Sequence, residues 1–308
     1  MNALFDALHL QVVQRDWLSS NHTVLVGPPG TTTAVVDTGY VAHADHTVAL
    51  LQSLLGPRPL QRVLNTHLHS DHCGGNRALQ AHWPGVSTAI PVGTWDAVQA
   101  WDEDRLSYRL TQQRCDRFAA DARLVPGDTH ELAGHAWEVH ATPGHDPDAV
   151  VLFQRQHRVL ISGDALWRRR VAVLFPELDE QAGFQPALDA LDLIESLDPA
   201  VVIPGHGEPF DEVADALAIS RSRLRALQAD PSAHARHASR VLLMFHMMEH
   251  RQRPLERMRH WLADTPLMQK AGVQRLLGQS AQQASTAILE GLLRDGALVQ
   301  DGEWVRLP

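Results

Sequence analysis

A hexapeptide at residues 67–72, HLHSDH, places four side chains that can bind metal within six positions. The predicted strand Arg62–Asn65 leads directly into it, so we expect these side chains in a loop at a strand end. A His-x-His pair can direct two imidazoles at one ion, and the Asp71-His72 pair can direct its ligands at a neighbouring ion. Imidazole and carboxylate together suit Zn²⁺, Fe or Mn²⁺. The alternative is four unrelated polar residues in a loop.

Three later motifs carry one candidate ligand each. His145 ends the sequence TPGH, Asp164 ends SGD, and His206 lies within PGHG. Each motif follows an apolar segment that we predict to be a strand, and loops at strand ends gather into sites. Any one of them alone could be an ordinary turn. Their order and their co-occurrence with the hexapeptide favour a common metal site.

Together with Asp37 in VVDTG, these motifs resemble all five motifs of the metallo-β-lactamase fold hydrolases, over about residues 10–210. The resemblance implies an α/β fold, an αββα sandwich with a dinuclear metal site, and a structural role for Asp37 near that site. It implies the following ligands: His67, His69 and His145 for the first ion, Asp71, His72 and His206 for the second, and Asp164 as the bridge.

Such a site predicts hydrolysis. Two ions near one water lower its pKa and generate a bridging hydroxide, and one ion also polarises the substrate oxygen. We expect Asp71, which adjoins both ions, to orient the nucleophile and take part in proton transfer. Two divalent ions are expected, with Zn²⁺ as the default and Fe or Mn²⁺ as alternatives. The predicted substrate is a small ester, thioester or related anionic compound.

Departures from the motifs argue against several subfamilies. β-Lactamases of the Cys-ligand type carry Cys where this chain has Asp164, and flavodiiron proteins carry Glu where it has His69. The run Gly207–Phe210 differs from the glutathione-binding run of glyoxalase II. The chain resembles the glyoxalase II-like or lactamase-like type. Its C-terminal region resembles that of lactamase-like hydrolases with a C-terminal winged helix, some of which cut single-stranded RNA.

Two alternative activities stay open. The first is an iron-dependent persulfide dioxygenase, an oxidoreductase that would use only His67, His145 and Asp164 around one iron. The intact second ligand set and the C-terminal region argue for hydrolysis instead. The second alternative is a single-strand ribonuclease, which the C-terminal region suggests.

The elements expected to position these motifs change in character near Phe210, where we predict a boundary between a catalytic domain (residues 1–210) and a helical domain (residues 211–308). The first part contains short β-rich segments separated by single helices, which is typical of sheets covered by helices. The predicted strands are Gln11–Trp17, His22–Val26, Ala34–Asp37, Arg62–Asn65, Ser87–Ile90, Ala136–Ala141, Val150–Phe153, Arg158–Ser162 and Val201–Ile203; the predicted helices are Ala42–Leu55 and Gln185–Leu197.

The second part predicts the helices Asp211–Ala229, Ala235–Arg251, Leu255–Leu262, Val273–Leu277 and Ser280–Arg294. Residues 297–307 then read as a hairpin with an Asp-Gly turn, so this region resembles a winged helix. The helix Ser280–Arg294 carries Arg294 as its only cation, which disfavours DNA binding. A cover over the site or a homodimer contact is the expected role.

Composition limits the functional classes further. The chain has 308 residues and a net charge of −9, which argues against nucleic-acid binding through bulk charge. No apolar run approaches the roughly 18 residues of a membrane span, so no membrane is expected. Two cysteines, Cys73 and Cys115, cannot form a disulfide framework, which fits a reducing, cytoplasmic location.

Three further features have two interpretations each. The run Arg168–Arg170 is either a cationic rim for an anionic substrate or a solvated run paired with nearby carboxylates. The aromatic residues of segment 93–122 either line a lid or pack inward. Cys73, which follows a predicted ligand, is more typical of a small buried residue than of a spare ligand.

Overall fold

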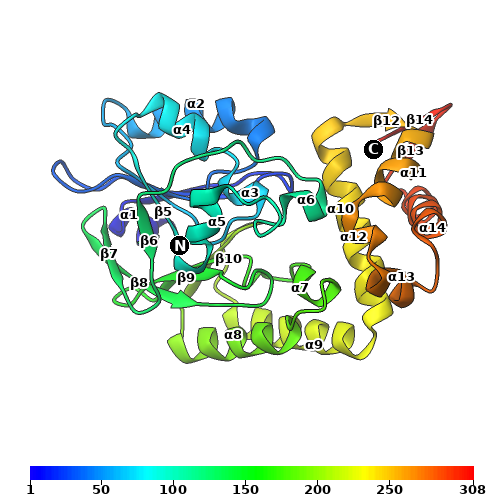
Figure 1. Ribbon diagram of the computed structural model, residues 1–308. Helices are drawn as coiled ribbons and strands as arrows, with labels where there is room; N and C mark the ends of the chain where they lie inside the picture. The colour runs from blue at the N-terminus through cyan, green and yellow to red at the C-terminus, as the bar shows by residue number, and fades with distance from the viewer.

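Two β-sheets pack face to face between layers of helices, in a computed structural model that describes residues 1–308 (Figure 1). The first sheet has the order β1-β2-β3-β4-β5-β6 and the second β11-β10-β9-β8-β7. The strands of the first sheet are β1 (Leu10–Val13), β2 (His22–Leu25), β3 (Ala34–Val36), β4 (Arg62–Leu64), β5 (Ser87–Pro91) and β6 (Ala122–Leu124). Those of the second are β7 (Thr129–Leu132), β8 (His135–Ala141), β9 (Val150–Gln154), β10 (Val159–Gly163) and β11 (Val201–Pro204).

Successive side chains of the central strands pack into two different apolar cores, because alternate residues of a strand point to opposite faces of the sheet. On β9, Leu152 lies in the core between the sheets, whereas Val151 and Phe153 lie in the core beneath the helices. On β3, Val36 faces the inner core and Val35 the outer one. These strands are apolar on both faces because both faces are covered.

Helices cover the outer face of each sheet. In Figure 1, α2 (Ala44–Leu55) and α4 (Asn76–His82) lie on one side, and α8 (Phe184–Leu197) and α9 (Val213–Ala229) lie on the other. The αββα sandwich predicted from the sequence is therefore confirmed. The short helices of this part are α1 (Asn2–Ala7), α3 (Ser70–Cys73), α5 (Trp95–Ala100), α6 (Tyr108–Thr111), α7 (Phe175–Leu178), and the 3₁₀ turns η1 (Val41–His43) and η2 (Val92–Thr94).

The C-terminal region has its own apolar core and a small sheet of order β12-β14-β13. Its elements are α10 (Pro231–His250), β12 (Gln252–Pro254), α11 (Leu255–Asp264), α12 (Pro266–Gln269), α13 (Ala271–Leu277), α14 (Ala281–Arg294), β13 (Val299–Asp301) and β14 (Trp304–Arg306). The predicted hairpin is confirmed, since β13 pairs antiparallel with β14 and Gly302 has a positive φ of 58° at the turn. The winged-helix classification and the boundary near Phe210 stay predictions.

A buried carboxylate fastens α10 to the sandwich. Glu249, whose side chain is 8% exposed, accepts a hydrogen bond of 2.9 Å from the Tyr40 hydroxyl and one of 2.8 Å from Arg114 Nε. Tyr40 follows β3 and Arg114 follows α6, so two segments of the first part hold one helix of the second. None of the helices combines the length and apolarity needed to cross a bilayer.

The predicted elements differ from the observed ones mainly at their ends and among the shortest pieces. The first strand ends at Val13 rather than Trp17. The predicted helix from Ala42 begins as the turn η1 and becomes α-helical at Ala44. The strands β6 and β7 were not predicted, because they have only three and four residues and too little periodicity to be recognised.

Candidate metal centre

The candidate ligands gather because the strands that precede them end at the same side of the sandwich. β3 and β4 are parallel neighbours in the first sheet, and β10 and β11 are parallel neighbours in the second. β8 runs in the direction of β10, because each is antiparallel to β9 between them. All seven predicted ligands therefore follow carboxyl ends of strands that meet at one edge, the usual location of sites in such folds.

Three histidines form a first cluster. The ligand nitrogens of His67, His69 and His145 lie within 4.8 Å of one another. His69 Nδ1 and His145 Nε2 are 2.8 Å apart. Two imidazole lone pairs facing each other at that distance repel unless a proton or a cation lies between them. The cluster has the composition of a nitrogen-ligand metal site.

A carboxylate and two histidines form a second cluster next to the first. Asp71 Oδ2 lies 3.1 Å from His206 Nε2 and 3.9 Å from His72 Nε2. The His206 ring stacks on Trp17, with ring centroids 5.4 Å apart and an interplanar angle of 8°, and Trp167 meets it edge-on. These indoles help to fix the orientation of the His206 ring, because its Nδ1 has no hydrogen-bond partner.

Asp164 lies between the two clusters. Its Oδ1 is 3.4 Å from His72 Nε2 in the second cluster, and its Oδ2 is 3.4 Å from His145 Nε2 in the first. Trp167 Nε1 donates a hydrogen bond of 3.0 Å to Oδ1. The carboxylate thus presents one oxygen to each group, which is the arrangement a bridging ligand requires.

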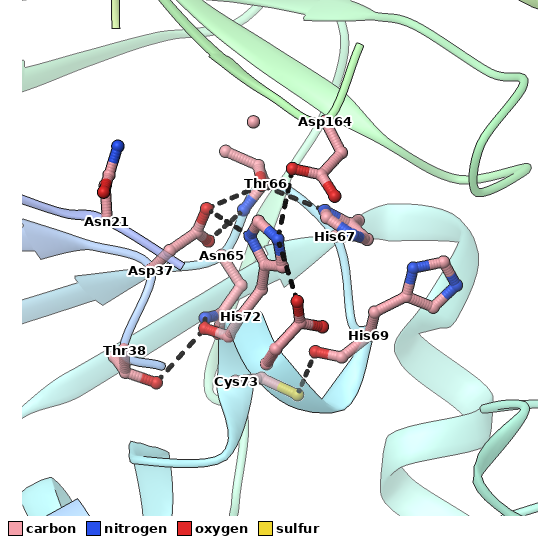
Figure 2. Close-up of polar contacts among 12 residues, drawn as sticks. Asn21, Asp37, Thr38, Asn65, Thr66, His67, His69, His72, Cys73 and Asp164 are labelled. Carbon is pink, nitrogen blue, oxygen red and sulfur yellow. Dashed lines mark hydrogen bonds and ion pairs between the residues drawn. The ribbon is translucent and has the colours of Figure 1, made fainter. Parts of the chain in front are cut away.

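Asp37 orients a histidine in each cluster, and Figure 2 shows it directed toward Thr66 and His72. Its Oδ2 accepts the Nδ1 proton of His72 at 2.8 Å and the hydroxyl proton of Thr66 at 2.8 Å. The Thr66 hydroxyl oxygen in turn lies 3.1 Å from His67 Nδ1, from which it can accept a proton. The Nε2 atoms of both histidines therefore face Asp164 and are the atoms left to bind a metal, as in metal-binding histidines with a carboxylate partner. Burial would lower the pKa of His72, but the carboxylates of Asp164, Asp37 and Asp71 raise it well above the usual value, so binding of a metal at this nitrogen displaces a proton.

The other two histidines of the first cluster have their own partners. His145 Nδ1 lies 2.5 Å from the carbonyl oxygen of Val173, and His69 Nε2 lies 3.8 Å from Asp146 Oδ2. Neither partner was predicted from the sequence. Asp146 adjoins a predicted ligand and could have been suspected on that ground, whereas a backbone carbonyl leaves no signal in sequence.

Burial keeps the histidines of the first cluster neutral. It lowers the pKa of His67 well below the usual value, and it lowers the pKa of His69 to about 4 and that of His145 to about 4. Burial by itself would raise the pKa of Asp164, but His72 and His206 beside it hold that pKa well below its ordinary range. Neutral imidazoles and an ionised carboxylate are the forms that bind metal.

The side chains present fit a pair of cations. His67 Nε2 and His72 Nε2 are buried and have no hydrogen-bond partner, although buried polar atoms in proteins almost always have one. Both unpartnered nitrogens point to the space around Asp164. The two clusters therefore fit a dinuclear divalent-metal site, and the assignment of the seven side chains as its ligands stays a prediction.

The backbone of the last loop approaches the centre so closely that only glycine fits. A Cβ at Gly205 would lie 2.2 Å from Asp164 Oδ1 and 2.7 Å from His72 Cε1. The missing side chain therefore allows β11 to bring its loop against the space between the clusters. Asn21 fixes that loop by donating hydrogen bonds to the carbonyl oxygens of Pro204 (3.0 Å) and Gly207 (2.7 Å).

The metal centre opens into a cavity of about 1090 Å³. Arg169 and Arg170 line it, while Arg168 pairs with Glu212 at the surface. The nearby carboxylates that could have paired with this run are engaged elsewhere: Glu177 accepts backbone N–H groups, Asp179 pairs with Lys270 and Glu180 with Arg275. The interpretation of this run as a cationic rim is therefore favoured for two of its three arginines.

The aromatic residues of segment 93–122 do not form a lid. Tyr108 and Phe118 are buried in one apolar cluster with Cys73, and Trp95 and Trp101 pack against it. The Tyr108 hydroxyl donates to the carbonyl oxygen of Leu68 at 3.0 Å. These residues support the ligand loop from behind, and Cys73 is the fully buried residue that the sequence predicted.

A family model described as "Metallo-beta-lactamase superfamily" matches residues 15–206. This range includes all seven candidate ligands and Asp37. It ends at His206, so the C-terminal region lies outside the match.

Three curated proteins illustrate the sequence similarity. The chain is 28% identical over 148 residues to a mitochondrial persulfide dioxygenase, ETHE1, of Bos taurus, covering 48% of this chain and 49% of that protein. It is 27% identical over 165 residues to the acyl-coenzyme A thioesterase MBLAC2 of Gallus gallus, covering 50% and 59%. It is 30% identical over 195 residues to a hydroxyacylglutathione hydrolase of Synechococcus, covering 62% and 65%. The chain thus matches about half to two thirds of the length of these relatives.

Two solved structures resemble the whole chain, including its C-terminal region. The metallo-beta-lactamase family protein TTHA1429 of Thermus thermophilus is 21% identical with a TM-score of 0.54, and the match covers 97% of this chain and 98% of that one. A beta-lactamase domain protein of Burkholderia ambifaria is 24% identical with a TM-score of 0.55, covering 96% and 91%. At these identities the likeness concerns the fold.

Proposed function

Because the chain belongs to the metallo-beta-lactamase superfamily, we propose that it is a dinuclear metal-dependent hydrolase of an ester, thioester or related anionic compound. The observation that carries the proposal is the position of Asp164, with one oxygen 3.4 Å from a ligand nitrogen of each cluster. Such sharing is expected of a two-ion centre and is unnecessary for a single ion.

When bound, a pair of divalent cations supplies the Lewis acidity that lowers the pKa of a water and polarises an acyl oxygen. The protein's own part is to hold the ligands in one tautomer, through Asp37 and Val173, and to exclude bulk water. Zn²⁺ fits the mixed nitrogen and oxygen ligands, as do Fe and Mn²⁺.

Asp71 is the proposed catalytic carboxylate. Its side chain is 14% exposed and lines the cavity, so it can contact a substrate. Burial would raise its pKa, but the neighbouring His72 and His206 lower it below the usual value, which keeps the group ionised. An ionised carboxylate here can orient an attacking water and accept its proton.

The test is a hydrolysis screen of the metal-loaded protein over thioesters, lactones, phosphodiesters and β-lactams. We expect turnover of an ester or thioester, lowered at least about 100-fold in Asp71→Ala, the usual scale for removal of an acid–base group. Cleavage of single-stranded RNA alone, abolished in the same variant, would replace this proposal with the ribonuclease alternative. Activity that is equal in the wild type and in the variant would belong to a contaminant.

The similarity to a persulfide dioxygenase supports a second candidate. That activity would use His67, His145 and Asp164 around one iron, and the structure brings these three side chains together. Oxygen consumption by the iron-loaded protein with glutathione persulfide, unaffected by loss of His206, would favour the dioxygenase. Absence of oxygen consumption together with thioester turnover would exclude it.

A further inference from the structure

The C-terminal region provides nearly half of the lining of the cavity beside the metal centre. At one side it is lined by His69, Asp71, His145, Asp164 and His206, and at the other by residues of α9, α10 and α14. Its volume of about 1090 Å³ is at the upper end of the range for sites that enclose small ligands. The substrate pocket is therefore larger than a short acyl ester needs.

One stretch of α10 gives the cavity an apolar wall. Val241, Met244, Phe245 and Met248 line it at the spacing i, i+3, i+4 and i+7, which places them on one helix face. At a rise of 1.5 Å per residue this wall is about 10 Å long. Val241 remains 37% exposed, so the wall is open to a ligand. Methionine side chains adapt to apolar ligands of different shape.

The preceding turn of α10 belongs to a cationic part of the same cavity. His237 and Arg240 lie there together with Arg170, from the loop after Asp164, and Arg223 of α9. Arg240 pairs with Asp295, whereas Arg170 and Arg223 have no carboxylate partner. The Arg170 guanidinium lies over the Trp17 ring at 5.0 Å, and Trp17 stacks on His206. Positive charge therefore extends from the metal centre along the cavity.

Burial lowers the pKa of His237, and the surrounding Arg240, Arg170 and Arg223 lower it further. Three arginines from three separate segments thus converge on one neutral imidazole. Such convergence costs stability through repulsion unless an anion occupies the space. Arginine is suited to that role because its planar group binds phosphate oxygens in pairs.

We propose that this cavity binds an acyl thioester whose apolar acyl chain lies along α10 and whose leaving group carries phosphate. The inference rests on the proposed hydrolytic function and specifies its substrate class. The apolar wall and the unpaired arginines lie on different parts of the cavity, with the metal centre beside both, so the two ends of such a substrate have separate places. In the reaction water adds to the acyl carbon and the carbon–sulfur bond breaks, giving a carboxylate, a thiol and one proton.

A matched set of thioesters tests the two ends separately. The probes are acetyl-, butanoyl-, hexanoyl- and octanoyl-coenzyme A, and the same acyl groups on uncharged N-acetylcysteamine. We expect kcat/KM to rise up to about fourfold per added methylene, the factor that corresponds to burial of one CH₂. We also expect the coenzyme A thioester to exceed the uncharged one at least about tenfold at equal chain length, with the difference reduced by salt.

Two substitutions assign the effects to residues. Arg223→Gln is expected to lower the preference for the charged over the uncharged thioester about tenfold, since a hydrogen bond to a charged group contributes at about this level. Arg225→Gln is the matched control, because Arg225 is an exposed residue of the same helix that does not line the cavity. Met244→Gln is expected to flatten the dependence on acyl-chain length.

The outcomes separate failure of this inference from failure of the proposed function. If kcat/KM depends neither on acyl-chain length nor on the charge of the leaving group, the hydrolase proposal stands and the pocket assignment is wrong. Hydrolysis of esters or lactones but of no thioester would leave the hydrolase standing and overturn this inference. If protein carrying two ions hydrolyses no ester, thioester or lactone, the proposed function fails. Binding of the uncleavable thioether S-octyl-coenzyme A, measured by calorimetry, then still decides the pocket: micromolar affinity weakened in Arg223→Gln supports it, and absence of binding overturns it.

Discussion

Replacement of Asp37 by Asn should remove one metal ion before the other. In the native protein Asp37 Oδ1 accepts the backbone N–H of Thr66 at 2.8 Å, and Oδ2 accepts from the Thr66 hydroxyl and from His72 Nδ1. In Asp37→Asn the amide oxygen can keep the backbone bond. The amide nitrogen then faces His72 Nδ1, and two donors cannot share one hydrogen bond.

His72 would relieve this conflict by moving its proton to Nε2. That nitrogen is the unpartnered atom that faces Asp164 at 3.4 Å, so the second cluster would lose one of its three lone pairs. Loss of a carboxylate partner behind a metal-binding histidine usually costs 10–100-fold in affinity or activity. That range corresponds to about 1.4–2.8 kcal/mol. The first cluster should be affected less, since His67 contacts Asp37 only through Thr66.

The assay is a competition titration with a chromophoric chelator, which resolves two binding constants per chain. Asp45→Asn is the control, because Asp45 is an exposed carboxylate in the first turn of α2, outside both clusters. We expect wild type and Asp45→Asn to share both constants, and Asp37→Asn to lose roughly 10–100-fold in the weaker one. Two unchanged constants in Asp37→Asn would refute the claim that this carboxylate sets the tautomer of His72.

Three further predictions concern other parts of the molecule. Gly205→Ala should lower metal content and activity at least about tenfold without unfolding the sandwich, because its Cβ would lie 2.2 Å from Asp164 Oδ1. If the variant keeps its metal content and its near-ultraviolet circular dichroism, the close approach of this loop is contradicted. Cys73 should stay unreactive toward a thiol reagent until the protein is denatured, because it is fully buried and burial raises the pKa of its thiol well above the usual value. A titration of the native protein with the reagent should therefore find at most one reactive thiol per chain. Burial lowers the pKa of His234 to about 4, so the unfolded chain binds its proton first as pH falls. Between pH 6.5 and pH 4 the free energy of unfolding, measured by denaturant titration, should therefore drop by about 2–3 kcal/mol more in the wild type than in His234→Gln, and equal drops would contradict the buried neutral imidazole.

The side chains that gather at the candidate metal centre could be found in the sequence because each is marked locally. His67, His69, Asp71 and His72 occupy six consecutive positions, and His145, Asp164 and His206 each follow an apolar strand. Strand ends are readable from hydrophobic runs and glycine-rich turns. Parallel neighbours in a sheet then bring such ends together, so a correct αββα prediction already implies one site.

The groups that orient the ligands were harder to predict. The role of Asp37 came only from the family resemblance, since nothing in VVDTG reveals a hydrogen bond to His72. The carbonyl of Val173 has no side-chain signature at all, because every residue carries the same acceptor.

The substrate cavity could not be derived from sequence for a different reason. The spacing of Val241, Met244, Phe245 and Met248 identifies an apolar helix face, but periodicity does not say which surface that face meets. The helix α10 reaches the metal centre only in the folded chain, where Glu249 accepts hydrogen bonds from Tyr40 and Arg114, which are far away in the sequence. Likewise, the sequence of segment 93–122 is compatible with an aromatic lid and with a packed cluster. The structure decides between them, because the Tyr108 hydroxyl donates a hydrogen bond to the carbonyl oxygen of Leu68.

The number of metal ions held by the purified protein tests the central claim most directly. After loading with Zn²⁺ and removal of excess metal, elemental analysis should find two ions per chain in the wild type. In Asp164→Ala, which keeps three ligands for each cluster but loses the carboxylate between them, it should find fewer than two, together with a collapse of hydrolysis and a retained fold. Saturation of the wild type at one ion, or two ions and full activity in Asp164→Ala, would contradict the dinuclear centre described for this chain.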